Sequence, residues 1–270
     1  MTRLAIGIDI GGTGIKGGLV NVKSGEFIGE RIRVMTPAGG EPEDIIAVTR
    51  EVIDQLNAPD GTPVGVAFPS VIRSGITMSA ANVSKRWIGF EAEAFFERGL
   101  GREIHFINDA DAAGFAEVKY GAAQDHDGLV ILTTLGTGIG SAVIYNGVLI
   151  PNTELGHLEI DGHDAETKAS SVAREREGIT YEEWAVRLQR YYSHLEMLFS
   201  PDLFLVGGGV SKSHDQFLPL LTLRTPIIPA TLLNRAGILG AAALAFDAHK
   251  SARTHDSAKG KKAASLSVGD

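Results

Sequence analysis

Short apolar and β-branched runs, separated by turns rich in glycine, dominate the pattern of this chain. Runs of this kind predict buried strands. In the N-terminal part they lie at Leu4–Ile10, Ile15–Val20, Glu26–Val34, Pro63–Phe68 and Ile104–Ile107. After residue 128 the pattern starts again, with runs at Leu129–Leu132, Ser141–Tyr145, Val148–Ile150 and Leu203–Val206.

Other segments repeat apolar residues at the three- and four-residue spacing of an amphipathic helix. Ile45, Ile46 and Ile53 make one such face, and Trp184 and Leu188 begin another. Helices are predicted at Glu41–Leu56, Glu91–Arg98, Ala110–Tyr120, Tyr181–Phe199 and Asn234–His249. Residues 250–270 are polar and basic with almost no apolar pattern, which predicts a disordered tail.

Strands and helices alternate in both parts of the chain, which is typical of an α/β protein. Because the pattern restarts, we expect two duplicated α/β domains around a cleft. The small N-terminal domain is predicted at 1–108, completed by the terminal helix at about 235–249. The large C-terminal domain is predicted at 109–234.

Each predicted domain carries a hairpin of glycine and threonine between two strands. The residues are Gly11, Gly12, Thr13 and Gly14 in the first hairpin and Gly136, Thr137 and Gly138 in the second. Glycine lets backbone N–H groups approach an anion, and threonine adds a hydroxyl donor. The hairpins therefore either grip a phosphoryl donor from both sides or are ordinary tight turns. A dinucleotide-binding loop fits less well, because strand-like sequence follows each turn where that motif needs a helix.

Composition narrows the class of protein. The chain has 270 residues, of which 44% are apolar and 21% charged, as in ordinary globular proteins. The net charge of −8 argues against general nucleic-acid binding. The lack of cysteine excludes disulfides and thiolate metal sites. There is no signal-peptide layout and no apolar stretch of membrane-spanning length, so we expect a cytoplasmic protein without membrane association.

Asn108 and Asp109 follow a predicted strand, at the end where open α/β sheets place their ligands. An aspartate there accepts the proton of a sugar hydroxyl as it attacks phosphorus, and the asparagine orients the same hydroxyl. Both residue types also favour the N-cap of a helix, so capping is the alternative interpretation.

Acidic residues and a histidine follow the second hairpin. Glu154, His157 and Glu166 are of the types that hold vicinal sugar hydroxyls, since each hydroxyl both donates and accepts. A metal site or a solvated acidic loop is the alternative.

The remaining candidates lie at other strand ends and turns. Asp9 offers a hard carboxylate for Mg²⁺, or it caps the turn. Lys16 offers a point charge for a donor phosphate, or it is an ordinary surface lysine. Gly207 and Gly208 offer bare backbone to a nucleotide, or they form a plain turn.

Four motifs together resemble those of the ROK-type sugar kinases of the actin/hexokinase superfamily. They are Asp9–Lys16, Asn108–Asp111, Leu135–Gly140 and Glu154–His157. The resemblance covers residues 4 to about 249. Two further segments are similar to those of the polyphosphate glucokinases, a group that includes glucomannokinases using polyphosphate or ATP. These segments are Asn82–Gly89 and Gly162–Ser170.

The resemblance implies a two-domain, actin/hexokinase-like (ribonuclease H-like) α/β fold with an interdomain cleft, and it implies that Asp109 is the catalytic base. The implied hexose ligands are Ser70, Asn82, Asn108, Gly138, Glu154, His157 and Glu166. The implied phosphate grip is Gly11, Gly12, Thr13, Gly14, Lys16, Gly136 and Thr137, with Gly207 and Gly208 on the nucleotide side.

Many ROK proteins carry a cysteine-rich zinc loop after the motif that Glu154–His157 resembles. This chain has no cysteine, so we expect no zinc. Glu166 lies where those proteins place a sugar-binding glutamate just after the zinc loop.

The activity implied is Mg²⁺-dependent transfer of the terminal phosphoryl group of inorganic polyphosphate, ATP or both to the 6-hydroxyl of glucose, and also of mannose. The family further implies a homodimer, with a hexose and a phosphoryl donor as its partners and no nucleic acid. The alternatives are an ATP-only ROK glucokinase and a catalytically silent sugar-sensing regulator. The negative net charge of the chain argues against a DNA-binding regulator.

Overall fold

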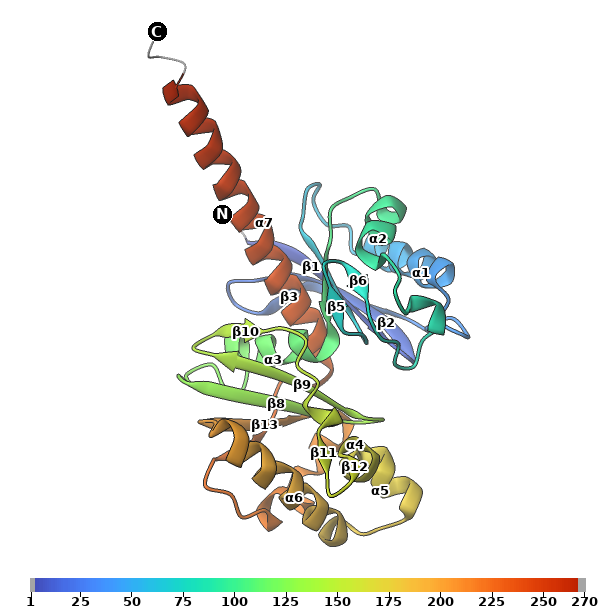
Figure 1. Cartoon of the computed structure of the whole chain (residues 1–270). Helices are drawn as coiled ribbons and strands as arrows, with labels where there is room; N and C mark the ends of the chain where they lie inside the picture. The colour runs from blue at the N-terminus through green and yellow to red at the C-terminus, as the bar shows by residue number, and fades with distance from the viewer. Residues whose placement is uncertain (1–2, 267–270) are drawn as a thin grey trace. The chain divides into compact units, whose positions relative to one another are not determined.

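A computed structural model describes the backbone of residues 3–266 and the side chains of residues 3–252. The chain divides into two compact units (Figure 1). Unit 1 is Met1–Ile107 with Ala241–Asp270, and unit 2 is Asn108–Gly240. The domain boundaries expected from the sequence are 108/109 and about 234/235.

Unit 1 is built on a five-stranded sheet in the order β3-β2-β1-β4-β7. Its strands are β1 (Leu4–Gly11), β2 (Gly14–Asn21), β3 (Glu26–Val34), β4 (Val64–Phe68) and β7 (His105–Asn108). The first three strands form an antiparallel meander, and β4 joins β1 in parallel. The remaining elements of the unit are α1 (Pro42–Gln55), β5 (Ile72–Arg73), β6 (Ile76–Thr77), η1 (Lys85–Trp87) and α2 (Ala92–Leu100).

The core of unit 1 is aliphatic along the sheet and aromatic beside it. Ile6, Ile8 and Ile10 of β1 are fully buried. Trp87 is also fully buried, and its indole N–H donates to the Gly40 carbonyl at 2.8 Å, which satisfies its one polar atom. The continuous apolar run of β1 is therefore a central strand covered on both faces.

Unit 2 repeats the sheet of unit 1, in the order β10-β9-β8-β13-β14. Its strands are β8 (Leu129–Leu135), β9 (Ile139–Tyr145), β10 (Val148–Ile150), β13 (Leu203–Gly207) and β14 (Ile227–Pro229). Again three strands form an antiparallel meander, and a fourth joins the first in parallel. This repetition confirms the expected α/β fold with two matching halves.

The longest helix of unit 2 is α6 (Tyr181–Phe199). Thr180 and Glu183 form a capping box at its start, and Ser200 ends it in the left-handed conformation. The other helices and short elements are α3 (Asp109–Tyr120), η2 (Leu155–His157), β11 (Glu159–Ile160), β12 (His163–Asp164), α4 (Glu166–Ala169), α5 (Ser171–Glu177), η3 (Gly209–Gln216), η4 (Leu218–Leu220) and η5 (Leu233–Arg235).

The last helix, α7 (Ala236–Leu266), is longer than the sequence pattern predicts. The predicted helix ends at His249, whereas the backbone of α7 continues through most of the segment expected as a disordered tail. No proline interrupts this stretch, and it is rich in alanine and lysine, which are strong helix formers. Residues 267–270 of the expected tail lie outside the described residues. Within the described chain, no helix combines the length and the apolarity needed to cross a bilayer.

Candidate functional site

The second glycine hairpin lies against the carboxylate of Glu166. Glu166 begins α4, and its Oε2 accepts a hydrogen bond from the Ile139 amide at 2.9 Å. A Cβ on Gly138 would lie 2.2 Å from the same oxygen, so any larger residue here would force the Glu166 carboxylate to shift. Thr137, at the tip of the hairpin, is exposed. The structure thus brings together Gly138 and Glu166, two residues proposed as hexose ligands.

The loop that carries Glu154 and His157 is tied to β9 by a buried serine. Ser141 Oγ donates to the Thr153 carbonyl at 2.6 Å and accepts from the Leu155 amide at 2.9 Å. The loop then closes as η2, which places Glu154 Oε2 3.8 Å from His157 Nε2. These two predicted sugar ligands are therefore neighbours.

The pKa of the Glu154 carboxyl reflects its burial and its charged neighbours. Burial raises the pKa of its carboxyl above the ordinary value; the imidazole of His157 lowers that pKa and the charge of Glu166 raises it again. Glu154, His157 and Glu166 thus form one polar cluster within unit 2.

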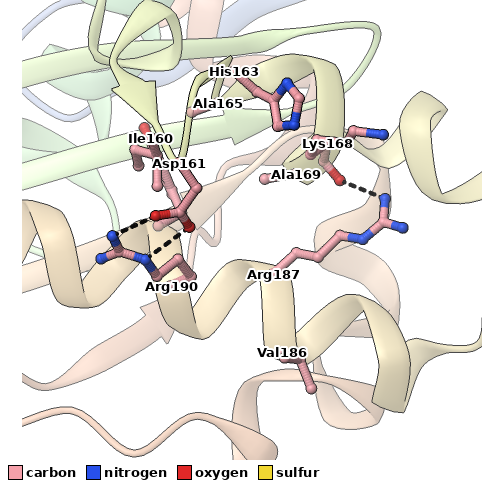
Figure 2. A pocket seen from close by; sticks show the side chains of 10 residues that line it. Ile160, Asp161, His163, Ala165, Lys168, Ala169, Val186, Arg187 and Arg190 are labelled. Carbon is pink, nitrogen blue, oxygen red and sulfur yellow. Dashed lines mark hydrogen bonds and ion pairs between the residues drawn. The ribbon is translucent and has the colours of Figure 1, made fainter.

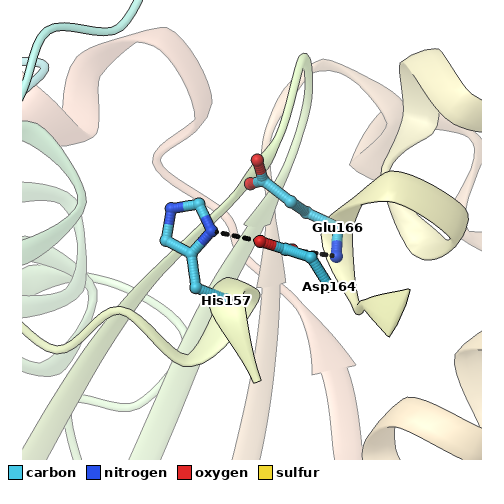
Figure 3. Close-up of side chains that lie close together, drawn as sticks. All are labelled: His157, Asp164 and Glu166. Carbon is cyan, nitrogen blue, oxygen red and sulfur yellow. Dashed lines mark hydrogen bonds and ion pairs between the residues drawn. The ribbon is translucent and has the colours of Figure 1, made fainter. Parts of the chain in front are cut away.

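Asp164 joins this cluster, although the sequence analysis gave it no role. Its Oδ2 lies 2.8 Å from His157 Nδ1 (Figure 3). This hydrogen bond is the main reason why the pKa of His157 is raised above its ordinary value. The sequence offers one weak signal for Asp164, which is its place between the motif Glu154–His157 and Glu166.

His157, Asp164 and Glu166 also offer three ligand atoms within 4.8 Å of one another, a spacing that suits a metal ion. Nδ1 of His157 and Oδ2 of Asp164 are already hydrogen-bonded to each other, and Glu166 holds the Ile139 amide. Each of the three side chains therefore already has a hydrogen-bond partner.

Asn108 and Asp109 lie at the junction of β7 and α3. Asn108 Oδ1 accepts from the amides of Ala110 at 2.9 Å and Asp111 at 3.0 Å, so Asn108 is the N-cap of α3. Capping, the alternative interpretation, is thus present. It also places the half-buried Asp109 as the first residue of the helix, where the helix dipole favours a carboxylate.

Asp111 is a buried carboxyl that the sequence analysis did not single out. Its side chain is 1% exposed, and Oδ2 accepts from the Asn152 amide at 2.7 Å. Among the described residues, Oδ1 has no hydrogen-bond partner. Burial, aided by the charge of Glu154, raises the pKa of Asp111 from 3.8 to about 7.

Gly207 and Gly208 lie where β13 ends beside β8. Gly207 pairs with Thr134, and a Cβ on Gly208 would lie 2.4 Å from the Leu135 carbonyl. Gly208 also has φ +84, a conformation that favours glycine. This turn therefore adjoins the strand that leads into the hairpin of Gly136 and Thr137.

In unit 1 the first hairpin carries an ion pair. Lys16 Nζ lies 2.9 Å from Asp9 Oδ2, across paired positions of β1 and β2. One carboxylate beside an ammonium group is a poor cation site by itself. It fits Mg²⁺ only if the phosphates of a donor supply the other oxygens, which is how Mg²⁺ is usually bound.

Of the other candidates of unit 1, Ser70 follows β4 and Asn82 lies between β6 and η1. Asn82 lies over the first hairpin, since a Cβ on Gly12 would lie 2.8 Å from that of Asn82. Thr13 is exposed beside them. Ser70 is only 3% exposed, and its hydroxyl donates to the Ser79 carbonyl at 2.8 Å. Ser70 stays a predicted hexose ligand, but its burial points to a role in shaping the loop.

A cavity of about 500 Å³ opens between the β11–β12 hairpin and α6 (Figure 2). Three of its lining residues are cationic, but each is already engaged. Arg190 pairs with Asp161 at 2.7 Å, while Arg187 and Lys168 pair with Glu177 at 2.7 and 3.5 Å. The sequence analysis did not predict this cavity, and its paired charges leave little attraction for an anion.

Comparisons with known proteins agree with the motifs. Residues 5–173 match the model of the ROK family. The chain is 48% identical to the polyphosphate glucokinase of Mycobacterium tuberculosis over 242 residues, covering 89% of this chain and 90% of the relative. The structure is similar to that of the inorganic polyphosphate/ATP-glucomannokinase from Arthrobacter sp. strain KM, with a TM-score of 0.85 and 56% identity over 91% of this chain and 99% of the other.

A third similar structure is the ROK family glucokinase from Streptomyces griseus in complex with glucose and AMPPNP. Its TM-score is 0.74 at 25% identity, over 90% of this chain and 99% of that chain. The family match covers both glycine hairpins and the Glu154–His157 motif. On this evidence the chain belongs to the ROK family.

Proposed function

We propose that this chain is a hexose kinase that transfers the terminal phosphoryl group of inorganic polyphosphate, ATP or both to the 6-hydroxyl of glucose, and also of mannose. The observation that carries the proposal is the cluster of Glu154, His157 and Glu166 beside the glycine hairpin of unit 2. Carboxylates and an imidazole converging in this way match the alternating donors and acceptors of a polyol. The kinase names of the similar proteins support the same reaction.

The choice of donor rests on the relatives. The curated relative at 48% identity is named a polyphosphate glucokinase, and the structure at 56% identity is named for both polyphosphate and ATP. We therefore propose that both donors are used. An ATP-only glucokinase is the second candidate, supported by the Streptomyces griseus structure that holds AMPPNP.

In the proposed mechanism, Asp109 orients the 6-hydroxyl and accepts its proton as the oxygen attacks phosphorus. Asp109 is the first residue of α3, so the helix fixes its backbone. Backbone amides of the two hairpins, together with Thr13, Thr137 and Lys16, hold the donor phosphates. Phosphoryl transfer needs mainly positioning and charge neutralisation, which these groups supply. Mg²⁺, when bound with the donor, neutralises the phosphate charge.

We further propose that the protein acts as a cytoplasmic homodimer that requires no zinc. The resemblance to the ROK sugar kinases supports the dimer, and the chain has no cysteine for a thiolate zinc site. Light scattering coupled to size-exclusion chromatography measures the mass in solution; a mass near 28.6 kDa would show a monomer instead.

The test is a matrix of donors against acceptors. Polyphosphate and ATP are each combined with glucose, mannose and fructose, and the phosphorylated sugar is measured directly. We expect glucose 6-phosphate with both donors, and far less from an Asp109→Asn protein at equal enzyme. Product from ATP alone would favour the ATP-only glucokinase. Sugar binding without any product would favour the sugar-sensing regulator.

A further inference from the structure

We propose that Asp164 is a positioning residue of this enzyme: it orients the imidazole of His157 so that Nε2 is the atom presented to the hexose. The inference rests on the proposed hexose kinase activity and deepens it, because it assigns a role to Asp164, which is not among the predicted site residues. It concerns side chains of unit 2 only.

The geometry places Asp164 between two proposed sugar ligands. Asp164 ends the β11–β12 hairpin, whose pairing with Glu159 fixes its backbone. One carboxylate oxygen, Oδ2, lies 2.8 Å from His157 Nδ1. The other, Oδ1, accepts from the Glu166 amide at 3.2 Å, and the Asp164 carbonyl accepts from Thr167 Oγ1 at 2.6 Å. Figure 3 shows the carboxylate of Asp164 directed at the ring of His157.

This contact decides which nitrogen of His157 carries the proton. A neutral imidazole has one N–H and one acceptor nitrogen, whereas a carboxylate can only accept. The proton therefore lies on Nδ1, facing Asp164, in both the neutral and the protonated ring. Nε2 is left for the ligand, and it already faces Glu154 Oε2 at 3.8 Å. A histidine whose second nitrogen is held by a carboxylate in this way has a fixed tautomer and ring orientation.

An aspartate is required here because two donors converge on it. The ring N–H of His157 and the backbone N–H of Glu166 each need an acceptor, and a carboxylate supplies two oxygens. Asparagine supplies one oxygen and an NH₂ group. In Asp164→Asn we expect the Glu166 amide to keep the side-chain oxygen, so that the NH₂ group faces Nδ1 and forces the proton to Nε2. Asparagine therefore has nearly the same shape as aspartate but cannot accept both hydrogen bonds.

The test joins a spectroscopic readout to kinetics. Nitrogen-15 NMR of the histidine side chains, with His157 assigned through a His157→Gln protein, reports which ring nitrogen is protonated. We expect the Nδ1–H tautomer in the wild type. In Asp164→Asn we expect the Nε2–H tautomer to become populated and the pKa of His157 to fall. The KM for glucose should rise roughly tenfold, about the loss of one charge-assisted hydrogen bond, with the donor KM unchanged.

Asp161→Asn is the matched control. Asp161 lies on the same hairpin but pairs with Arg190, and the pKa of His157 does not depend on it. Its backbone φ of 55 is one that asparagine tolerates. We expect the wild-type tautomer of His157 and an unchanged KM for glucose in this variant.

The outcomes separate this inference from the proposed function. An Nε2–H tautomer of His157 in the wild type would overturn the role of Asp164 without any variant, even if Asp164→Asn failed to fold. An unchanged tautomer and glucose KM in a folded Asp164→Asn protein would do the same while leaving the kinase activity intact. If the wild type phosphorylates no sugar, the proposed function fails, and the NMR result alone decides whether Asp164 orients His157.

Discussion

At the scale of single residues, Asp109 is the group on which the proposed chemistry depends. Asp109→Asn keeps the size of the side chain and its place on α3 but removes the proton acceptor. We expect kcat to fall by at least about 10²-fold, the lower range for a positioned acid–base group, with little change in the KM for glucose. Steady-state kinetics with polyphosphate and with ATP check this. Near-normal turnover would show that Asp109 is not the catalytic base.

Gly138 makes a second residue-scale prediction, because its missing side chain leaves room for the Glu166 carboxylate. In Gly138→Ala the new Cβ would lie 2.2 Å from Glu166 Oε2, so the carboxylate must move away from the hexose site. We expect the KM for glucose to rise by about tenfold or more, the effect of losing one ligand hydrogen bond. Gly136→Ala is the control for hexose affinity, since a Cβ there meets nothing within 4 Å. Equal glucose KM values for the two variants would contradict this account.

At the scale of elements, Asp111 at the start of α3 makes a contribution to folding stability that depends on pH. Its pKa is about 7 in the folded state against 3.8 for the ordinary side chain. Between these values the folded protein keeps a proton that the unfolded chain releases, so this contribution to stability is full below pH 3.8 and is lost as the pH rises through 7.

Asp111→Asn removes this pH dependence of the stability, because asparagine resembles the protonated carboxyl and does not ionise. We expect the free energy of unfolding of the variant, measured relative to that of wild type, to be larger at pH 8 than at pH 5 by on the order of 2 kcal/mol, because only wild type loses stability over this range. Urea denaturation of both proteins at the two pH values measures the difference. The same gap between variant and wild type at both values would show that Asp111 is ionised in the fold.

The capping box of α6 gives a prediction about stability alone. The Thr180 hydroxyl accepts from the Glu183 amide at 3.2 Å, and Glu183 Oε2 accepts from the Thr180 amide at 2.9 Å. Thr180→Ala should lower the free energy of unfolding by about 1 kcal/mol, the usual value of an N-cap, with kcat and KM unchanged. Thermal unfolding and a glucose kinase assay check the two parts. A loss of activity without loss of stability would tie α6 to the reaction instead.

The sequence predicts the elements well where their period is clear. The strand Glu26–Val34 and the helix Tyr181–Phe199 have the expected limits, since alternation or a long amphipathic face marks each of them. The short helices α4 and α5 and the strand β14 were not predicted. A four-residue helix is too short to show a period, so tertiary contacts determine it.

At the scale of the whole molecule, the duplicated sheet order explains why the motifs come in pairs. The two meanders place a glycine hairpin at the same point of each unit, and that much follows from the sequence. The hydrogen bonds of Asp111 and Asp164 could not be predicted. Asp111 meets its partner Asn152 across 41 residues, and Asp164 meets His157 only because the β11–β12 hairpin turns back.

Ligand binding should stabilise the molecule as a whole. A hexose that binds only the folded state adds about 2.7 kcal/mol at a concentration of 100 times its Kd. We expect a glucose-dependent rise in Tm for the wild type and for Asp109→Asn, and a much smaller rise for His157→Ala at the same glucose concentration. Equal shifts in all three proteins would place the sugar away from His157.

In the proposed function, the carboxylates and imidazole of unit 2 hold a hexose beside Asp109. A crystal structure of the protein soaked with glucose and a phosphate mimic tests it most directly. We expect sugar hydroxyls hydrogen-bonded to Glu154, His157 and Glu166, with the 6-hydroxyl at Asp109 and the mimic at the hairpin of Thr137. Glucose bound elsewhere, with those side chains unoccupied, would contradict it.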